Sequence, residues 1–100
     1  MDNSAQQAIE NTHLHYVFII AFARTRDYAE AKDAADNAAR CLTELARLLS
    51  PTSPLFPEMR QLRSIIQSAR QNLARQQQPQ NLDKGLDLIT AIEKRLTPGN

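Results

Sequence analysis

The sequence predicts an all-α protein, a dimeric four-helix bundle in which two helical hairpins pack antiparallel in an up-down-up-down order. Alanine and leucine dominate the chain and there is only one valine, a composition that favours helices over strands. Only two glycines are present, so signals for tight β-hairpin turns are scarce. Apolar residues recur at alternating spacings of three and four, which is the period of an amphipathic helix.

Length and composition narrow the class of protein further. The 100 residues fit one domain, and the hydrophobic fraction of 42% excludes the disordered chains of low hydrophobicity. The single cysteine, Cys41, excludes a disulfide framework and any metal site built from several cysteines. The net charge of +1 excludes the strongly basic signature of many nucleic-acid-binding proteins. We expect one domain over residues 1–100, with hairpins at 4–49 and 56–96 and a proline-rich linker at 50–57.

The first hairpin is predicted from helices over Ser4–Arg24 and Asp27–Leu49. Asp27, followed by Glu30 three residues later, is typical of a capping box at the start of the second helix. The second helix also has the clearest apolar seam, which one face of a helix would bury against a neighbour. The seam residues are Tyr28, Ala31, Ala35, Ala38, Leu42, Leu45 and Leu49.

The junction between these two helices is less clearly marked. The segment 24–26 contains neither glycine nor proline, so one continuous helix from Ser4 to Leu49 is the alternative. A turn near Arg26 is favoured because it would set bulky residues of the first helix against alanines of the second. The bulky residues are Val17, Phe18 and Phe22, and the alanines are Ala31, Ala35 and Ala38.

The residues around this junction resemble a known helical turn. Residues 26–31, with Ala38 after them, are similar to the helix-to-helix turn of a tetratricopeptide repeat, in which Gly-Asp-Tyr is followed by spaced alanines. Arg26 stands where that family has its glycine, Ile19 occupies another position expected to be small, and the closing proline is absent. The resemblance covers about twenty residues. Such a fold needs about three repeats for stability, and this chain has room for two. It supports a hairpin at Arg26 and assigns no family.

The second hairpin follows a linker with three prolines, which stop the preceding helix. We predict helices over residues 56–77 and Leu82–Leu96, with Asn81 as the N-cap of the last one. Gly85 inside this last helix indicates close approach by a neighbouring helix. The two apolar seams are Leu55, Met59, Leu62, Ile66, Ala69 and Leu73, and Leu82, Leu86, Ile89, Ile92 and Leu96.

The stretch 16–23 reads YVFIIAFA and is apolar on every side of the first helix. It is too short to span a membrane, which takes about 20 residues, and no basic residue precedes it as in an export signal. With an unpaired cysteine, the expected location is the cytoplasm. Burying one face of this stretch would leave the other exposed, so we expect it to bind another protein chain. The predicted interface residues are Tyr16, Val17, Phe18, Ile20 and Phe22.

Arginines gather on one side of the third predicted helix, opposite its apolar seam. They could contact phosphates, so nucleic-acid binding is the alternative function. Four charges make a small patch and no aromatic residue is interleaved for base stacking, so a solvated face is favoured. The residues of this arginine face are Arg60, Arg63, Arg70 and Arg75.

Catalytic and metal-binding patterns are incomplete. Glu10 and His13 have the Glu-x-x-His spacing of di-iron bundles, but the second such pair would have to come from a dimer. The acidic series from Asp27 to Asp36 is expected to point outward and so to lack the convergence of a magnesium site. Cys41 has no nearby histidine to activate it. We therefore expect no catalytic residue, metal, cofactor, small-molecule substrate or membrane contact.

These observations predict a non-enzymatic helical-bundle protein that acts through protein–protein contacts, as an adaptor, small chaperone or regulator. The expected partner is a second copy of the chain.

Overall fold

The computed structural model describes residues 3–96, and this part of the chain contains four α-helices and no strand. The all-α prediction is therefore confirmed. Two helices have the predicted bounds, and the other two are shorter by one to three residues at their ends. The helices are α1 (Ser4–Arg24), α2 (Tyr28–Leu48), α3 (Phe56–Ala74) and α4 (Leu82–Leu96).

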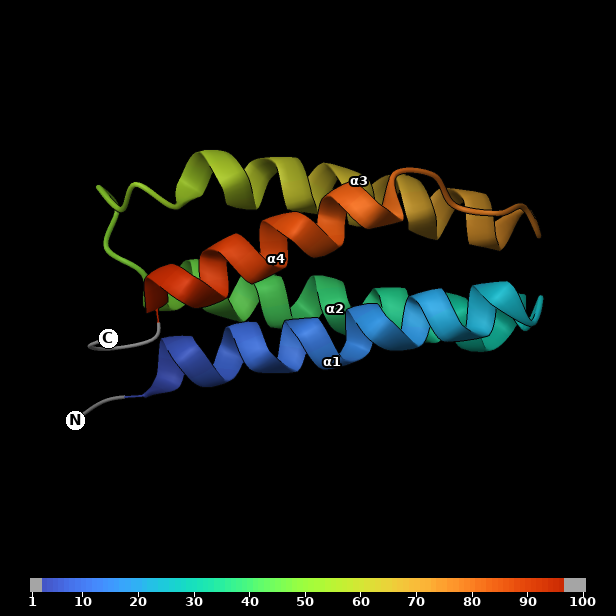
Figure 1. The fold of residues 1–100 in the computed structure, drawn as a ribbon, viewed down its shortest axis with the longest axis horizontal. Coiled ribbons are helices and arrows are strands. Elements are labelled where there is room, and N and C mark those ends of the chain that lie inside the picture. Colours follow the sequence, from blue (N-terminus) through green and yellow to red (C-terminus); the bar gives the residue numbers. More distant parts are fainter. Residues whose placement is uncertain (1–2, 97–100) are drawn as a thin grey trace.

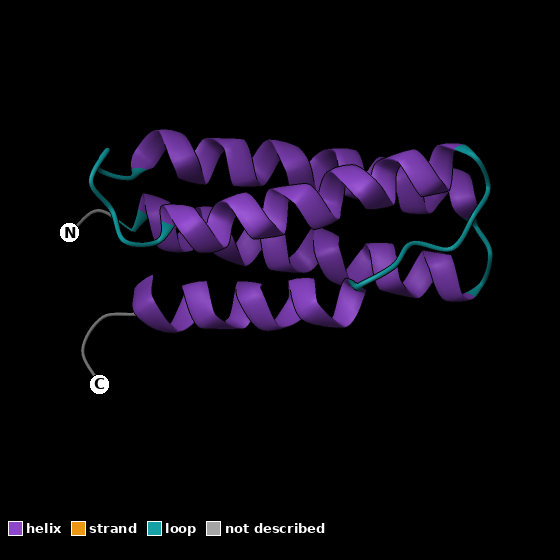
Figure 2. Ribbon diagram, turned by 90° about the horizontal axis from the view of Figure 1, so that it is seen from above, coloured by secondary structure: helices purple, strands orange, loops and turns teal. Residues whose placement is uncertain are grey.

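The four helices lie side by side along the length of the molecule (Figures 1 and 2). Two of the connecting loops lie at its ends, and the one between α3 and α4 starts at an end and runs back along the bundle to the start of α4. Each helix contacts the next one in the chain, and α1 also contacts α4. Within the described residues, no Cα atom of α1 comes within 8 Å of one in α3, and the same holds for the other diagonal pair, α2 and α4. The helices thus surround one shared core, and every helix keeps one side turned away from its neighbours.

The chain breaks between α1 and α2, so the alternative of one continuous helix is wrong. Arg26 adopts a left-handed conformation with φ of 61°. Its backbone N–H donates to the carbonyl of Ala23, and the N–H of Asp27 donates to that of Phe22. This pair of hydrogen bonds is the Schellman arrangement that ends many helices, here with arginine in the place of glycine.

The end of α3 repeats the same device. Gln76 has φ of 58°, and the N–H groups of Gln76 and Gln77 donate to the carbonyls of Leu73 and Asn72. The helix therefore stops at Ala74, three residues before the predicted end. A polar stretch with good helix formers hides this stop from sequence inspection, because no glycine marks it.

The predicted capping box at the start of α2 does not form. Asp27 is the N-cap residue, but its side chain makes no hydrogen bond to the first turn. Its carboxylate lies 2.8 Å from the hydroxyl of Thr25 instead. The carboxylate therefore serves the turn between the two helices, and that prediction is corrected.

The core is built from the predicted seams of α2, α3 and α4. All six seam residues of α3 are buried, and so are Ala31, Ala35, Ala38, Leu42 and Leu45 of α2. The expectation for α1 was wrong in part, because Val17 and Phe18 do not face the alanines of α2 and are exposed. The inward residues of α1 are Ala8, Ile9, Thr12, Tyr16, Ile19 and Ala23.

Candidate functional site

The outward side of α1 carries an apolar surface. Leu14, Val17 and Phe18 are 51%, 42% and 40% exposed, and they are the exposed large hydrophobic residues of the described chain. Their spacing of three and four residues, with the exposed Ala21 one step further, puts them on one side of the helix. We call these four residues, Leu14, Val17, Phe18 and Ala21, the outer face of α1. Helices that dock onto a partner present anchors at this spacing.

The structure separates the five residues predicted for the interface. Val17 and Phe18 lie on the outer face of α1, whereas Ile20 and Phe22 are partly buried and pack against the core. Tyr16 is fully buried within its own chain, so it cannot meet a partner and its assignment to the interface is corrected. The continuous apolar run hid this division, because it contains residues of the inward and the outward side alike.

Leu14 belongs to the outer face of α1 although it was not predicted there. It lies outside the continuous apolar run, between two histidines. The signal that could have found it is its distance of three and four residues from Val17 and Phe18, which places all three on one helix side. Periodicity was therefore a better guide to this surface than the length of the apolar run.

Neighbouring rings support Phe18 from one side. Its ring centre lies 6.1 Å from that of His15, nearly edge-on, and 6.3 Å from that of Phe22. Both separations fall in the range of favourable aromatic pairs. Because these contacts leave Phe18 exposed, the ring is positioned by its own helix and still open to a partner.

A charged residue follows the outer face of α1 at each end. Glu10 precedes Leu14 by four residues and Arg24 follows Ala21 by three, and both are exposed. Within residues 3–96, neither side chain takes part in an ion pair. The apolar surface thus ends in an unpaired acid on one side and an unpaired base on the other.

The structure gives Glu10 and His13 different surroundings. His13 Nδ1 lies 2.7 Å from Glu93 Oε1, so this histidine joins α1 to α4. No group of three or more histidine, cysteine or acidic side chains that could hold a metal ion occurs among the described residues. Glu10 is therefore exposed, whereas His13 is paired with Glu93.

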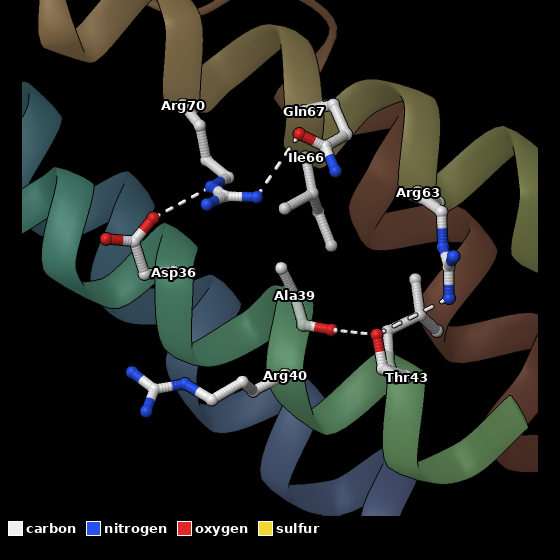
Figure 3. A pocket seen from close by; sticks show the side chains of 9 residues that line it. Asp36, Ala39, Arg40, Thr43, Arg63, Ile66, Gln67 and Arg70 are labelled. Carbon is white, nitrogen blue, oxygen red and sulfur yellow. Dashed lines mark hydrogen bonds and ion pairs between the residues drawn. The ribbon is translucent and has the colours of Figure 1, made fainter. Parts of the chain in front are cut away.

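The arginine face of α3 meets α2 in a groove with a volume of about 430 Å³. Figure 3 shows Arg70 turned toward Asp36 of α2 at one end and Arg63 turned toward Thr43 at the other. The distances are 2.7 Å from Arg70 Nε to Asp36 Oδ1 and 3.5 Å from Arg63 Nη2 to Thr43 Oγ1. Ile66 lines the groove between these two contacts.

The four predicted arginines do not converge on one ligand position. Arg63 and Arg70 line the groove, Arg60 lines a neighbouring hollow with Arg63, and Arg75 follows the end of α3. Arg40 of α2 also lines the groove, and sequence inspection missed it because it belongs to another helix. The groove thus has arginines on both walls, and the α2 wall also carries one acidic residue, Asp36.

Asp36 is the acid in this groove, contrary to the expectation that the acidic series of α2 only points outward. Partial burial alone would raise the pKa of its carboxyl. The hydrogen bonds and charges of Lys32 and Arg70 outweigh this effect and lower the pKa below its ordinary value. Asp36 therefore stays ionised and neutralises part of the positive charge of the arginine face.

Cys41 is a partly buried thiol beside the core. Burial raises its pKa, and the charge of Arg40 offsets only part of this effect. The thiolate is the nucleophilic form of cysteine, so the protonated side chain is a poor nucleophile near neutral pH.

No protein-family model, no curated protein and no solved structure matches the chain. Within residues 3–96, no helix has both the length and the apolar character needed to cross a membrane.

Proposed function

We propose that this chain is a non-enzymatic bundle protein that acts through protein–protein contacts, and that the outer face of α1 binds a second copy of the chain. The observation that carries the proposal is the gathering of Leu14, Val17 and Phe18 on one side of one helix, each 40–51% exposed. A contiguous exposed apolar surface is unfavourable in water and marks an interaction site. An adaptor, a small chaperone or a regulator would use such a surface.

The shape of the outer face favours a second copy as its partner. A large residue, Leu14, lies near one end and a small one, Ala21, near the other. A two-fold-related copy would set each large residue against a small one, as packed helices require. The same surface can therefore cover itself without a different protein.

The strength expected of this contact is modest. Full burial of a leucine, valine or phenylalanine contributes roughly 1.5–3 kcal/mol, and these three side chains are already about half buried. Six such side chains in a dimer would supply several kcal/mol, against which association itself costs free energy. A micromolar dissociation constant needs about 8 kcal/mol of net binding free energy, so other contacts between the two copies must add to the burial of these side chains.

We also propose that the four helices keep the up-down-up-down order of two antiparallel hairpins, and that the protein works in the cytoplasm. The helix order is supported by the contacts between helices adjacent in the chain and by the contact of α1 with α4. The cytoplasm suits a chain with one unpaired thiol.

Light scattering at increasing protein concentration tests the proposed self-association. The mass should rise from 11.3 kDa toward twice that value, and Phe18→Glu should keep the protein monomeric with an unchanged helical circular dichroism spectrum. Gln61→Glu, which adds the same charge on the exposed side of α3, is the matched control and should still dimerise. A wild-type chain that stays monomeric at high micromolar concentration would overturn the proposal.

Nucleic-acid binding through the arginine face is the second candidate function. It is favoured by Arg40, which adds a cation from α2 beside Arg63 in the groove, and weakened by Asp36, which occupies Arg70. Fluorescence anisotropy with a single-stranded oligonucleotide tests it. Affinity should fall steeply with added salt and be lost when Arg60 and Arg63 are changed to alanine. An absence of binding at low salt would remove this candidate.

A further inference from the structure

We propose that the two copies pair through antiparallel α1 helices related by a two-fold axis at Val17, with Glu10 of each copy facing Arg24 of the other. This inference rests on the proposed self-association and adds its direction, its register and two charged residues. The proposed interface consists of the outer face of α1 and the two charged residues beyond its ends, Glu10 and Arg24.

The spacing along α1 supports this register. Glu10, Leu14, Val17, Ala21 and Arg24 follow one another at steps of four, three, four and three. That alternation keeps all five on one seam of the helix, as in a pair of packed helices. Glu10 and Arg24 each lie seven residues from Val17, or about 10.5 Å along the axis. A two-fold axis at Val17 therefore brings the acid of one copy beside the base of the other, and does so twice.

The signs of these charges select the antiparallel direction. In a parallel pair, each Glu10 would meet the other Glu10 and each Arg24 the other Arg24. Like charges side by side disfavour association, whereas complementary charges fix direction and register. In the antiparallel pair Glu10 lies beside Arg24 at both positions, so both contacts are attractive.

The two charged side chains are available for this role. Both are exposed, and within the described part of the chain neither forms an ion pair with its own subunit. A pairing between copies would therefore compete with no ion pair of the isolated subunit.

Charge reversal tests the arrangement in the full-length chain, with sedimentation equilibrium as the measurement. Glu10→Arg and Arg24→Glu, each alone, should weaken dimerisation about tenfold or more, because two attractive meetings per dimer become repulsive. The double variant Glu10→Arg/Arg24→Glu should restore the wild-type dissociation constant. Glu30→Arg, on an exposed site of α2, is the matched control and should leave the constant unchanged.

Cross-linking separates the two directions. In a Cys41→Ser background, a mixture of the Glu10→Cys and Arg24→Cys variants should form a disulfide between unlike copies under mild oxidation. Cross-links only between like copies would show a parallel pair and overturn the inference. A dimer that Phe18→Glu disrupts but charge reversal does not would also overturn it while leaving the proposed function intact. A strictly monomeric wild-type chain would remove both.

Discussion

The phenol of Tyr16 on α1 lies against the backbone of Gly85 on α4. Its hydroxyl donates a 2.7 Å hydrogen bond to the carbonyl of Leu82, in the first turn of α4. Burial, and to a smaller degree the charge of Asp83, raise the pKa of this phenol, so it remains a donor at any physiological pH. A side chain that was expected at the interface is thus buried and forms one of the links between the first helix and the last.

The glycine makes this contact sterically feasible. A Cβ atom at position 85 would lie 2.0 Å from Tyr16 Oη and 2.7 Å from Tyr16 Cζ, far inside van der Waals contact. We expect Gly85→Ala to lower the free energy of unfolding by up to about 2 kcal/mol. Overpacking a buried site costs roughly 1–3 kcal/mol, and the better helix propensity of alanine returns about 1 kcal/mol. Urea denaturation followed by circular dichroism measures the difference.

A double-mutant cycle separates this clash from other effects of the substitution. In a Tyr16→Phe background, Gly85→Ala should cost less, because the atom nearest to the new methyl group is gone. Tyr28→Phe, at the other tyrosine of the chain, is the matched control and should leave the cost of Gly85→Ala unchanged. Equal costs in all three backgrounds would contradict the steric explanation.

Much of the fold could be predicted from sequence because its seams are regular. The α3 seam from Leu55 to Leu73 repeats at three and four residues without interruption, and every member is buried. The segment 16–23 offered no such contrast, since it is apolar on all sides. Composition therefore predicted that a surface would be left over on α1, but not that Tyr16 would turn inward and Leu14 outward. Which side of α1 turns inward depends on the side chains that α2 and α4 place against it.

Helix ends were harder to predict than helix faces, and the end of α1 offers a test. Arg26 adopts φ of 61°, a conformation that costs a residue with a Cβ atom about 1 kcal/mol. We expect Arg26→Gly to raise the free energy of unfolding by about 0.5–1 kcal/mol, because glycine removes this strain but loses more backbone entropy on folding. Thermal denaturation at fixed ionic strength measures it.

The neighbouring Thr25 provides the control for this prediction. Its φ of −92° is ordinary for any residue, so Thr25→Gly relieves no strain. That substitution should lower stability, because it adds only freedom to the unfolded chain and removes the hydroxyl beside Asp27. Loss of stability in both variants would mean that the left-handed residue at the α1 end is not strained.

A groove formed by two helices cannot be predicted from the sequence of one of them, as the arginine face of α3 shows. The angular spacing of residues around α3 places four arginines on one side of the helix: Arg60, Arg63, Arg70 and Arg75. The groove that two of them line needs α2, because Asp36, Arg40 and Thr43 form its other wall. No spacing within one helix encodes this pairing, which follows from how α2 and α3 pack.

The Asp36 ion pairs give the protein a defined dependence on acid. The pKa of this carboxyl is lowered in the folded state, by Lys32 at 3.1 Å and Arg70 at 2.7 Å against the opposing effect of burial. Its contribution to stability is therefore fully present above the unfolded value near 3.8 and is lost as the pH falls through the lower folded value. We expect Asp36→Asn to destabilise the protein by about 1 kcal/mol or less at neutral pH, since both pairs are partly exposed.

Urea midpoints measured at neutral pH and at successively lower pH test this expectation against a second acidic residue. The difference between wild type and Asp36→Asn should shrink below the unfolded value near 3.8, because the charge that distinguishes the two chains is then being lost. Glu44→Gln is the control. Glu44 pairs with Arg47 within one exposed turn of α2, where solvent screens the lowered pKa of its carboxyl, so its loss should move the midpoint less than Asp36→Asn does at neutral pH. A difference for Asp36→Asn that persists undiminished into strong acid would show that Asp36 stabilises the α2/α3 contact by packing rather than by its charge.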